Sequence, residues 1–215
     1  FLYNHLFSSP ADFWNSRQIH SAEQQLALLG FAGVPVEDKP KSRLTVTEKA
    51  RKSIEEKLQS PIATRQSPIA LLHPIAAFDT KQWATENFAR ITEFLSEKGF
   101  QTIAVATKKE RGVLENLKIL SNAPVITFDD LTLPEITALA SRAAIFVGND
   151  SGIAHIAAAV NTPGVVVFGS SNRVHWRPWT DAPNEIVYEK FPCQPCAGPR
   201  RCVGTSALAA CSRAT

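Results

Sequence analysis

A polar turn between an apolar strand and a small-residue helix is the part of this sequence best suited to chemistry. It lies in residues 146–169, FVGNDSGIAHIAAAVNTPGVVVFG, where the turn Gly148–Gly152 follows an apolar run and precedes a row of alanines. A helix that begins in this way points its free N–H groups and the positive end of its dipole at the carboxyl edge of a sheet. The turn therefore predicts a site for an anion such as a phosphate.

Four residues of this segment are candidate ligand-binding residues. Asp150 and Ser151 occupy the turn, and Gly152 lets a ligand approach the backbone closely. His155 lies three residues past Gly152 and four past Ser151, so it shares their helical face and can hydrogen-bond a phosphate or its neighbours. The alternative is that Asn149, Asp150 and Ser151 only cap the helix and that His155 has a structural role.

Lys81 is a further candidate because it stands in the first turn of an expected helix, Lys81–Lys98. Helix N-termini favour acidic side chains, so a lysine there is unfavourable unless an anion binds beside it. Its ammonium group is a mobile point charge that can offset negative charge developing on a leaving group. The alternative is a lysine that contacts only solvent.

The composition indicates an ordinary globular chain and excludes several classes of protein. The 215 residues are 44% apolar and 20% charged, and 23 Lys and Arg against 20 Asp and Glu give a net charge of +3. That charge is too small to indicate nucleic acid as the main partner, and none is expected. No apolar run approaches the roughly 18 residues of a membrane span. The chain contains no methionine, which predicts that Phe1 is not the native start.

All four cysteines lie near the end of the chain, at Cys193, Cys196, Cys202 and Cys211. Nothing marks the chain as secreted, so a disulfide framework is not expected. The gaps between the cysteines match no common zinc pattern. We expect reduced cysteines that pack among apolar side chains, with a structural metal as the alternative.

Apolar runs and helical patterns alternate from residue 68 onward. Short buried strands are predicted at Pro68–His73, Thr102–Ala106, Val125–Phe128, Ala144–Val147 and Val165–Phe168. Helical patterns lie between them at Lys81–Lys98, Glu110–Leu120, Pro134–Arg142 and Gly152–Val160. This βαβαβαβαβ series predicts an α/β fold, a Rossmann-like parallel sheet with helices on both faces.

The first third of the chain follows a different pattern and contains no core that we can identify as self-sufficient. A helix is expected over Ala22–Leu29, with Gly30 as its end. Thr45 and Glu48 form a capping-box pattern before a charged helix of about Glu48–Leu58. We expect this part to be the end of a preceding domain and a linker.

The order of these motifs resembles glycosyltransferase family 9, the ADP-heptose:lipopolysaccharide heptosyltransferases. DSGIAHIAAAVNTPGVVVFG resembles the family pattern Asp-(Ser/Thr)-Gly-x-x-His, a small-residue helix, a Thr-Pro turn, a β run and Phe-Gly. Further segments that resemble the family, in chain order, are Arg17…His20…Glu23…Leu28-Leu29-Gly30, His73-Pro74, Lys81-Gln82-Trp83, Glu110 and the cysteine-bearing tail. The resemblance therefore covers nearly the whole chain.

The resemblance implies one half of a GT-B glycosyltransferase fold, in which two Rossmann-like domains face each other across a cleft. Residues 68–215 would be the nucleotide-sugar-binding (donor) domain, and residues 1–67 the end of the acceptor domain plus a linker. The implied activity is transfer of heptose from ADP-heptose to a lipid-linked lipopolysaccharide core acceptor, without a cofactor. The enzyme would act in the cytoplasm, at the inner face of the inner membrane, and touch that membrane peripherally.

The resemblance also implies roles for particular residues. The implied donor-binding residues are Lys81, Glu110, Asp150, Ser151, Gly152 and His155. Lys81 would face the diphosphate and act as a catalytic residue. The base proposed for the family is an Asp of the other domain, and nothing in this sequence matches it.

Two loops depart from the family pattern. Ala76-Ala77 stands where hydroxyl residues often precede the lysine, and Thr107-Lys108-Lys109 lacks the usual glycine before Glu110. Another transferase or epimerase that uses a UDP-sugar is therefore an alternative, and so is a non-catalytic nucleotide-binding module. In the segment His175-Trp176-Arg177-Pro178-Trp179, Trp176 and Arg177 could hold a base or a phosphate. The alternative is a surface loop anchored by its own tryptophans.

Overall fold

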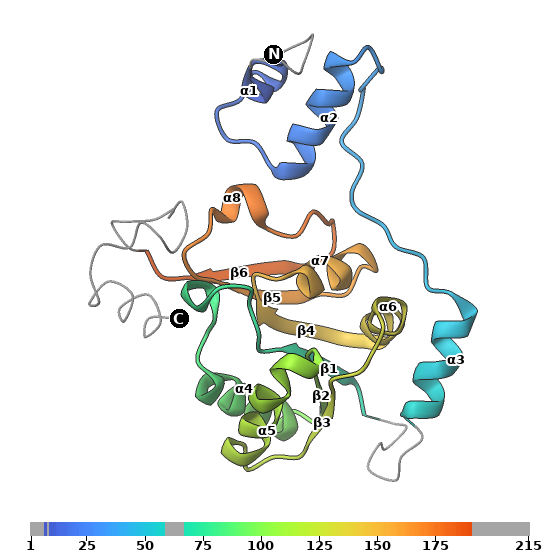
Figure 1. The fold of residues 1–215 in the computed structure, drawn as a ribbon, viewed down its shortest axis with the longest axis vertical. Coiled ribbons are helices and arrows are strands. Elements are labelled where there is room, and N and C mark those ends of the chain that lie inside the picture. The colour runs from blue at the N-terminus through green and yellow to red at the C-terminus, as the bar shows by residue number, and fades with distance from the viewer. Residues whose placement is uncertain (1–6, 8, 59–66, 191–215) are drawn as a thin grey trace.

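The centre of the fold is a six-stranded parallel sheet, drawn in Figure 1 for a computed structural model that describes residues 7, 9–58 and 67–190. Its strands are β1 (Ile69–His73), β2 (Gln101–Val105), β3 (Val125–Phe128), β4 (Ala143–Asn149), β5 (Gly164–Phe168) and β6 (Asn184–Tyr188). Their spatial order is β3-β2-β1-β4-β5-β6, and every neighbouring pair is parallel. The order reverses between β1 and β4, and open α/β sheets bind ligands at such a switch point.

Helices cover both faces of the sheet. The α-helices are α1 (Pro10–Trp14), α2 (Ser21–Phe31), α3 (Glu48–Lys57), α4 (Thr85–Glu97), α5 (Arg111–Leu120), α6 (Leu133–Arg142), α7 (Gly152–Ala159) and α8 (Arg173–Trp176). Short 3-10 turns are η1 (Asp79–Lys81) and η2 (Lys108–Glu110). Helices α4 and α5 pack on one face of the sheet, and α3, α6 and α7 lie on the other (Figure 1). The predicted Rossmann-like architecture is confirmed.

Side chains of β1 divide between the two cores that the helices enclose. Leu71 packs into the core that includes Ile54 of α3 and Leu139 of α6. Leu72, its neighbour, packs into the core that includes Phe88 of α4 and Leu117 of α5. All five residues of β1 are buried, as the apolar run predicts for a strand covered on both sides.

The helix predicted over Lys81–Lys98 begins later than expected. Helix α4 starts at Thr85, and Lys81 is the last residue of η1 instead of a first-turn residue. Tertiary hydrogen bonds hold the intervening loop out of the helix. The Trp83 N–H donates to Asn149 Oδ1 (3.0 Å), and the Ala76 N–H donates to Gln82 Oε1 (3.2 Å). The helix-dipole argument for Lys81 was therefore wrong.

Smaller differences occur elsewhere. Helix α2 runs one residue past Gly30, whose missing Cβ leaves room for the Phe13 ring. Thr47, and not Thr45, caps α3, with its hydroxyl accepting the Ala50 N–H (3.3 Å). Strand β6 and helix α8 were not predicted.

Helix α3 is joined to the sheet domain through α6. Ala50 and Ile54 of α3 are buried in the same core as Leu139. Glu135 of α6 accepts hydrogen bonds from Ser53 Oγ (2.6 Å) and pairs with Lys57 Nζ (3.0 Å). The proposed division of the chain at residue 67 stays a prediction, and α3 packs with the elements that follow it.

Glu135 should make folding sensitive to acid. The Ser53 hydroxyl and the Thr132 N–H and hydroxyl lower the pKa of Glu135 from 4.5 to about 2. Since the pKa of Glu135 is lowered in the folded state, its carboxylate stabilises the fold fully above about pH 4.5. That stabilisation is lost progressively as the pH falls through about 2. Glu135→Gln should lower the free energy of unfolding by about 1–3 kcal/mol near neutral pH.

Denaturant unfolding at several pH values tests this expectation. The difference in the free energy of unfolding between wild type and Glu135→Gln should shrink as the medium is acidified. The control, Glu56→Gln, changes an exposed carboxylate of α3 and should alter little. A deficit independent of pH would contradict the role given to the ionised Glu135.

In the part of the chain that the structure describes, no helix has the length and hydropathy needed to cross a membrane. The four cysteines, from Cys193 to Cys211, lie outside the described residues. The predictions about their packing and metal binding therefore stay predictions.

Candidate nucleotide-binding site

An ion pair lies where β4 ends and α7 begins. Lys81 Nζ is 2.8 Å from Asp150 Oδ2, and the side chains are 21% and 7% exposed. The Ser171 hydroxyl donates to the same carboxylate oxygen (2.5 Å). Three segments distant in sequence thus meet at the carboxyl edge of the sheet, next to the switch point between β1 and β4.

The loop that carries Lys81 is fastened to the loop after β5. The Ser170 N–H donates to the Thr80 carbonyl (3.0 Å), and the two hydroxyls lie 2.9 Å apart. Gly169 permits this approach, because a Cβ there would overlap the Thr80 carbonyl oxygen and lie 2.8 Å from the Cα of Lys81. These contacts therefore fix the backbone from which the Lys81 side chain extends, and the ion pair with Asp150 directs its ammonium group.

Gly169→Ala should displace these two loops. Overpacking against backbone costs about 1–3 kcal/mol, so we expect a lower melting temperature. Gly112→Ala is the matched control, because a Cβ at this helical position would meet no atom within 4 Å. That control should be neutral or stabilising by up to about 1 kcal/mol. Equal melting temperatures of wild type and Gly169→Ala would contradict the close approach.

The side chain of Ser151 does not cap α7. Ser151 is the N-cap residue, yet its hydroxyl makes no capping bond and is buried without a hydrogen-bond partner among the described residues. The Nδ2 group of Asn149 is also buried without a hydrogen-bond partner among the described residues, while its Oδ1 accepts the Trp83 N–H. Buried polar groups in native proteins nearly always have partners, so these atoms favour a ligand-binding turn over a simple helix cap.

His155 lies within electrostatic reach of the ion pair. Burial lowers the pKa of His155 below 6.5, Asp150 raises it and Lys81 lowers it further. The imidazole is therefore neutral near pH 7 and can take up a proton when a second negative charge arrives.

Gly152 opens α7 at the surface of this site. An added Cβ would meet no protein atom within 4 Å, so the backbone of the first helical turn can be approached from outside. A phosphate can accept hydrogen bonds from N–H groups in such a place. The structure thus brings together five predicted site residues, Lys81, Asp150, Ser151, Gly152 and His155.

The sixth predicted residue, Glu110, stands apart from this group. It lies beyond β2, two strands from β4, and its carboxylate accepts the N–H (3.1 Å) and the hydroxyl (2.6 Å) of Thr107. Burial lowers the pKa of the nearby His73. Two weaker effects raise that pKa: the hydrogen bond between His73 Nδ1 and the Val105 carbonyl oxygen (2.9 Å) and the charge of Glu110. Its role in donor binding stays a prediction.

Ser171 was missed by the sequence analysis, although Ser170-Ser171 directly follows the Phe-Gly pair that the family pattern includes. For the nearby segment 175–179, two interpretations were open: binding of a base or phosphate, or a loop anchored by its own tryptophans, and one of the two tryptophans does anchor it. Trp179 is nearly buried and donates to the Pro40 carbonyl (2.9 Å), while Trp176 is 46% exposed.

Among the residues that the structure covers, no group of three or more His, Cys, Asp or Glu side chains could hold a metal ion.

An open parallel sheet with helices on both faces and a polar turn at its switch point defines a Rossmann-like domain. The model of glycosyltransferase family 9 (heptosyltransferase) matches residues 14–204, so the chain belongs to this family. The Rossmann-like sheet is accordingly one half of a GT-B glycosyltransferase fold.

Individual relatives agree with this assignment. Lipopolysaccharide heptosyltransferase 3 of Escherichia coli is 31% identical over 115 residues, 52% of this chain and 34% of that protein. A glycosyltransferase family 9 structure from Veillonella parvula has a TM-score of 0.72 at 20% identity and covers 81% of this chain and 50% of its own. E. coli heptosyltransferase WaaC with ADP has a TM-score of 0.60 at 16% identity, and the match covers 81% of this chain and 52% of the WaaC chain. The chain thus spans about half the length of these structures, and a third of heptosyltransferase 3.

Proposed function

We propose that this chain is the donor-binding half of a glycosyltransferase that moves heptose from ADP-heptose to a lipopolysaccharide core acceptor. A relative that is 31% identical over 115 residues is a lipopolysaccharide heptosyltransferase, and the similar WaaC structure holds ADP. One observation carries the proposal: the Lys81–Asp150 ion pair beside the unpaired Ser151 hydroxyl at the N-terminus of α7. These groups suit a diphosphate and the hydroxyls of a sugar.

In the proposed reaction an acceptor hydroxyl oxygen attacks the anomeric carbon of the donor. The bond from that carbon to the diphosphate oxygen breaks, ADP leaves, and the hydroxyl proton passes to a base. The resemblance implies that this base belongs to the family's other domain. The residues described here position the donor and stabilise the leaving diphosphate.

Each site residue has a distinct part in this proposal. Lys81 donates a charge-assisted hydrogen bond to a diphosphate oxygen as negative charge develops there. Asp150 holds Lys81 in place and accepts from sugar hydroxyls, because a carboxylate would repel a phosphate. Ser151, Gly152 and His155 offer a hydroxyl, a backbone N–H and an imidazole to the donor. Glu110, which stands apart from these residues, would accept from donor hydroxyls, as the resemblance implies.

The whole enzyme, by this proposal, works in the cytoplasm at the inner face of the inner membrane, which it contacts peripherally to reach a lipid-linked acceptor. No nucleic acid partner and no cofactor are proposed.

Calorimetric titration of this chain with ADP and with UDP, beside a transfer assay on the same sample, tests the proposal. We expect ADP to bind and no sugar to be transferred. Preference for UDP would favour the alternative of a UDP-sugar enzyme, and binding of neither nucleotide would contradict the donor site. Turnover by this chain alone would place the base within it and contradict the proposed division of labour.

A further inference from the structure

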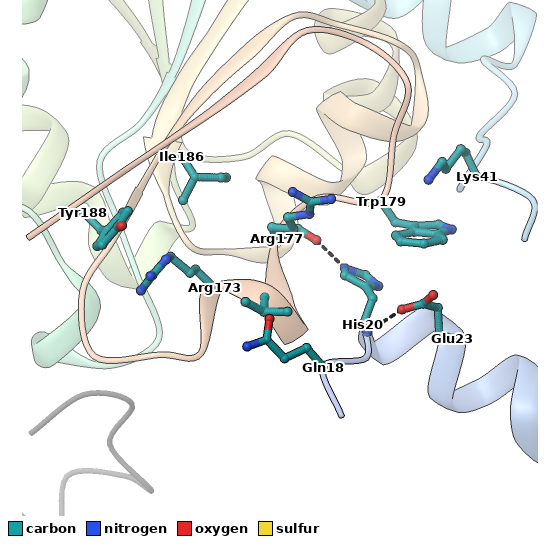
Figure 2. A pocket seen from close by; sticks show the side chains of 10 residues that line it. Gln18, His20, Glu23, Lys41, Arg173, Arg177, Trp179, Ile186 and Tyr188 are labelled. Atoms are coloured by element: carbon teal, nitrogen blue, oxygen red, sulfur yellow. Dashed lines mark hydrogen bonds between the residues drawn. The ribbon is translucent and has the colours of Figure 1, made fainter. Parts of the chain in front are cut away.

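His20 joins the α1–α2 segment to the loop that follows β5. Its Nε2 lies 2.6 Å from the carbonyl oxygen of Arg177, and its ring stacks on Trp179 with centroids 4.5 Å apart (Figure 2). His20 is only 5% exposed, although it belongs to the first third of the chain. The ring thus lies against the sheet domain, next to α8, where Figure 1 also places the start of α2.

The hydrogen bonds of His20 require one neutral tautomer. Nδ1 accepts the N–H of Ala22 (3.0 Å) as the cap of α2, so it carries no proton. The Arg177 carbonyl can only accept, so Nε2 carries the proton and donates it. Burial lowers the pKa of His20, and this favours the same neutral form. Glu23, His155 and His175 are the titratable groups that influence the ring.

Other bonds fasten the same two parts of the chain. His175 Nδ1 lies 3.1 Å from the Ile19 carbonyl, and Trp179 Nε1 donates to the Pro40 carbonyl (2.9 Å). The Ser42 N–H donates to the Trp179 carbonyl (3.1 Å). The loop is therefore held on both sides of Arg177 by residues from before β1.

The loop that His20 holds also reaches the candidate site. Ser171, which donates to Asp150, is separated from Arg177 only by Asn172 and the single turn of α8. Asn172 caps that turn, and the Arg177 N–H donates to the Arg173 carbonyl (3.1 Å). A displacement of Arg177 is therefore transmitted through a short, hydrogen-bonded turn to Ser171 and to the carboxylate that holds Lys81.

We propose that His20 is a positioning residue for the donor site, acting through its Nε2–H···O=C bond to Arg177 and hence through Ser171 on Asp150. This inference rests on the proposed function, because it assigns His20 to the site that would bind the nucleotide sugar. It makes the segment before the sheet domain part of the donor site's construction.

Two variants separate this bond from the capping of α2. Asn at position 20 can place an acceptor where Nδ1 lies and caps helices well, but it cannot reach Arg177. Gln can place a donor where Nε2 lies, and the adjoining cavity of about 510 Å³ has room for its side chain (Figure 2). Gln is, however, a poor helix cap. His20→Asn therefore keeps the cap and loses the bond to Arg177, whereas His20→Gln does the reverse.

Two measurements on this chain decide the matter. In titrations with ADP, His20→Asn should raise the Kd by about 3–10-fold, and His20→Gln should stay within about two-fold of wild type. Without nucleotide, the amide of Ser170, which donates to Thr80, should exchange its hydrogen faster in His20→Asn than in His20→Gln.

The reverse order of the two variants in both measurements would mean that His20 acts only as a helix cap, and would overturn the proposal. If wild type fails to bind ADP, the proposed function fails, but the exchange measurement still tests the connection from His20 to Ser170. Equal exchange in the two variants would overturn that connection whatever the nucleotide does.

Discussion

Replacing Lys81 with alanine is expected to lower kcat for sugar transfer by about 100-fold in a protein that contains both halves of the enzyme. The ammonium group would meet the diphosphate where charge grows as the donor bond breaks, so its loss should affect the transition state more than the ground state. Steady-state kinetics test this. A raised KM with unchanged kcat would contradict it and indicate ground-state binding alone.

Lys81→Ala should also leave Asp150, only 7% exposed, without a positively charged partner, since Ser171 supplies a hydrogen bond but no charge. An uncompensated carboxylate would repel the diphosphate, so ADP affinity of this chain should fall about 10–100-fold. Adding Asp150→Asn to Lys81→Ala should recover part of that loss, because the repelling charge is gone. Lys118→Ala, which removes an exposed lysine of α5, is the control and should leave the Kd unchanged. If the double variant loses as much binding free energy as Lys81→Ala and Asp150→Asn lose together, coupling between Lys81 and Asp150 is contradicted.

His155→Ala is expected to weaken ADP binding by about 1–3 kcal/mol while the fold stays intact. The imidazole is near the Lys81–Asp150 pair and shares a helical face with Ser151 and Gly152. Calorimetry on the folded variant measures this loss. Unchanged affinity would remove His155 from the site.

The affinity should depend on pH through the same residue. Burial lowers the pKa of free His155, and a bound diphosphate would raise it, so binding should take up a proton. Affinity for ADP-glucose, whose doubly esterified diphosphate does not titrate near neutrality, should therefore increase as pH falls from about 8 to 6. His155→Gln keeps a donor but cannot ionise, and it should bind with little pH dependence. The same pH dependence in both proteins would contradict proton uptake by His155.

The strands and the polar turn before α7 could be predicted because their signals are local. Each apolar run between turn residues predicted a buried strand, and the structure has β1 to β5 at those places. The turn before Gly152 could be recognised because a strand end, polar residues and a small-residue helix are contiguous. Strand β6 (Asn184–Tyr188) has a weaker signal, since it lies at the sheet edge and mixes polar with apolar residues.

Long-range contacts could not be predicted from one sequence. The Lys81–Asp150 bond joins residues 69 positions apart, and helical periodicity placed Lys81 in the wrong element. Ser171 gave no signal of its own, because serine after a strand is typical of any turn. The bond from His20 to Arg177 spans 157 positions and depends on how the first third of the chain folds back onto α8.

The central claim is that the turn between β4 and α7 binds a nucleoside diphosphate, and amide chemical shifts in a nuclear magnetic resonance titration with ADP test it most directly. We predict the largest shift changes at Ser151, Gly152 and Ile153, in the first turn of α7, with changes at Lys81 as its ammonium engages the phosphate. These changes should be lost together in Lys81→Ala at the same ADP concentration. Saturating ADP that leaves the amides of residues 149–155 unchanged, or shifts only amides elsewhere in the chain, would contradict the claim.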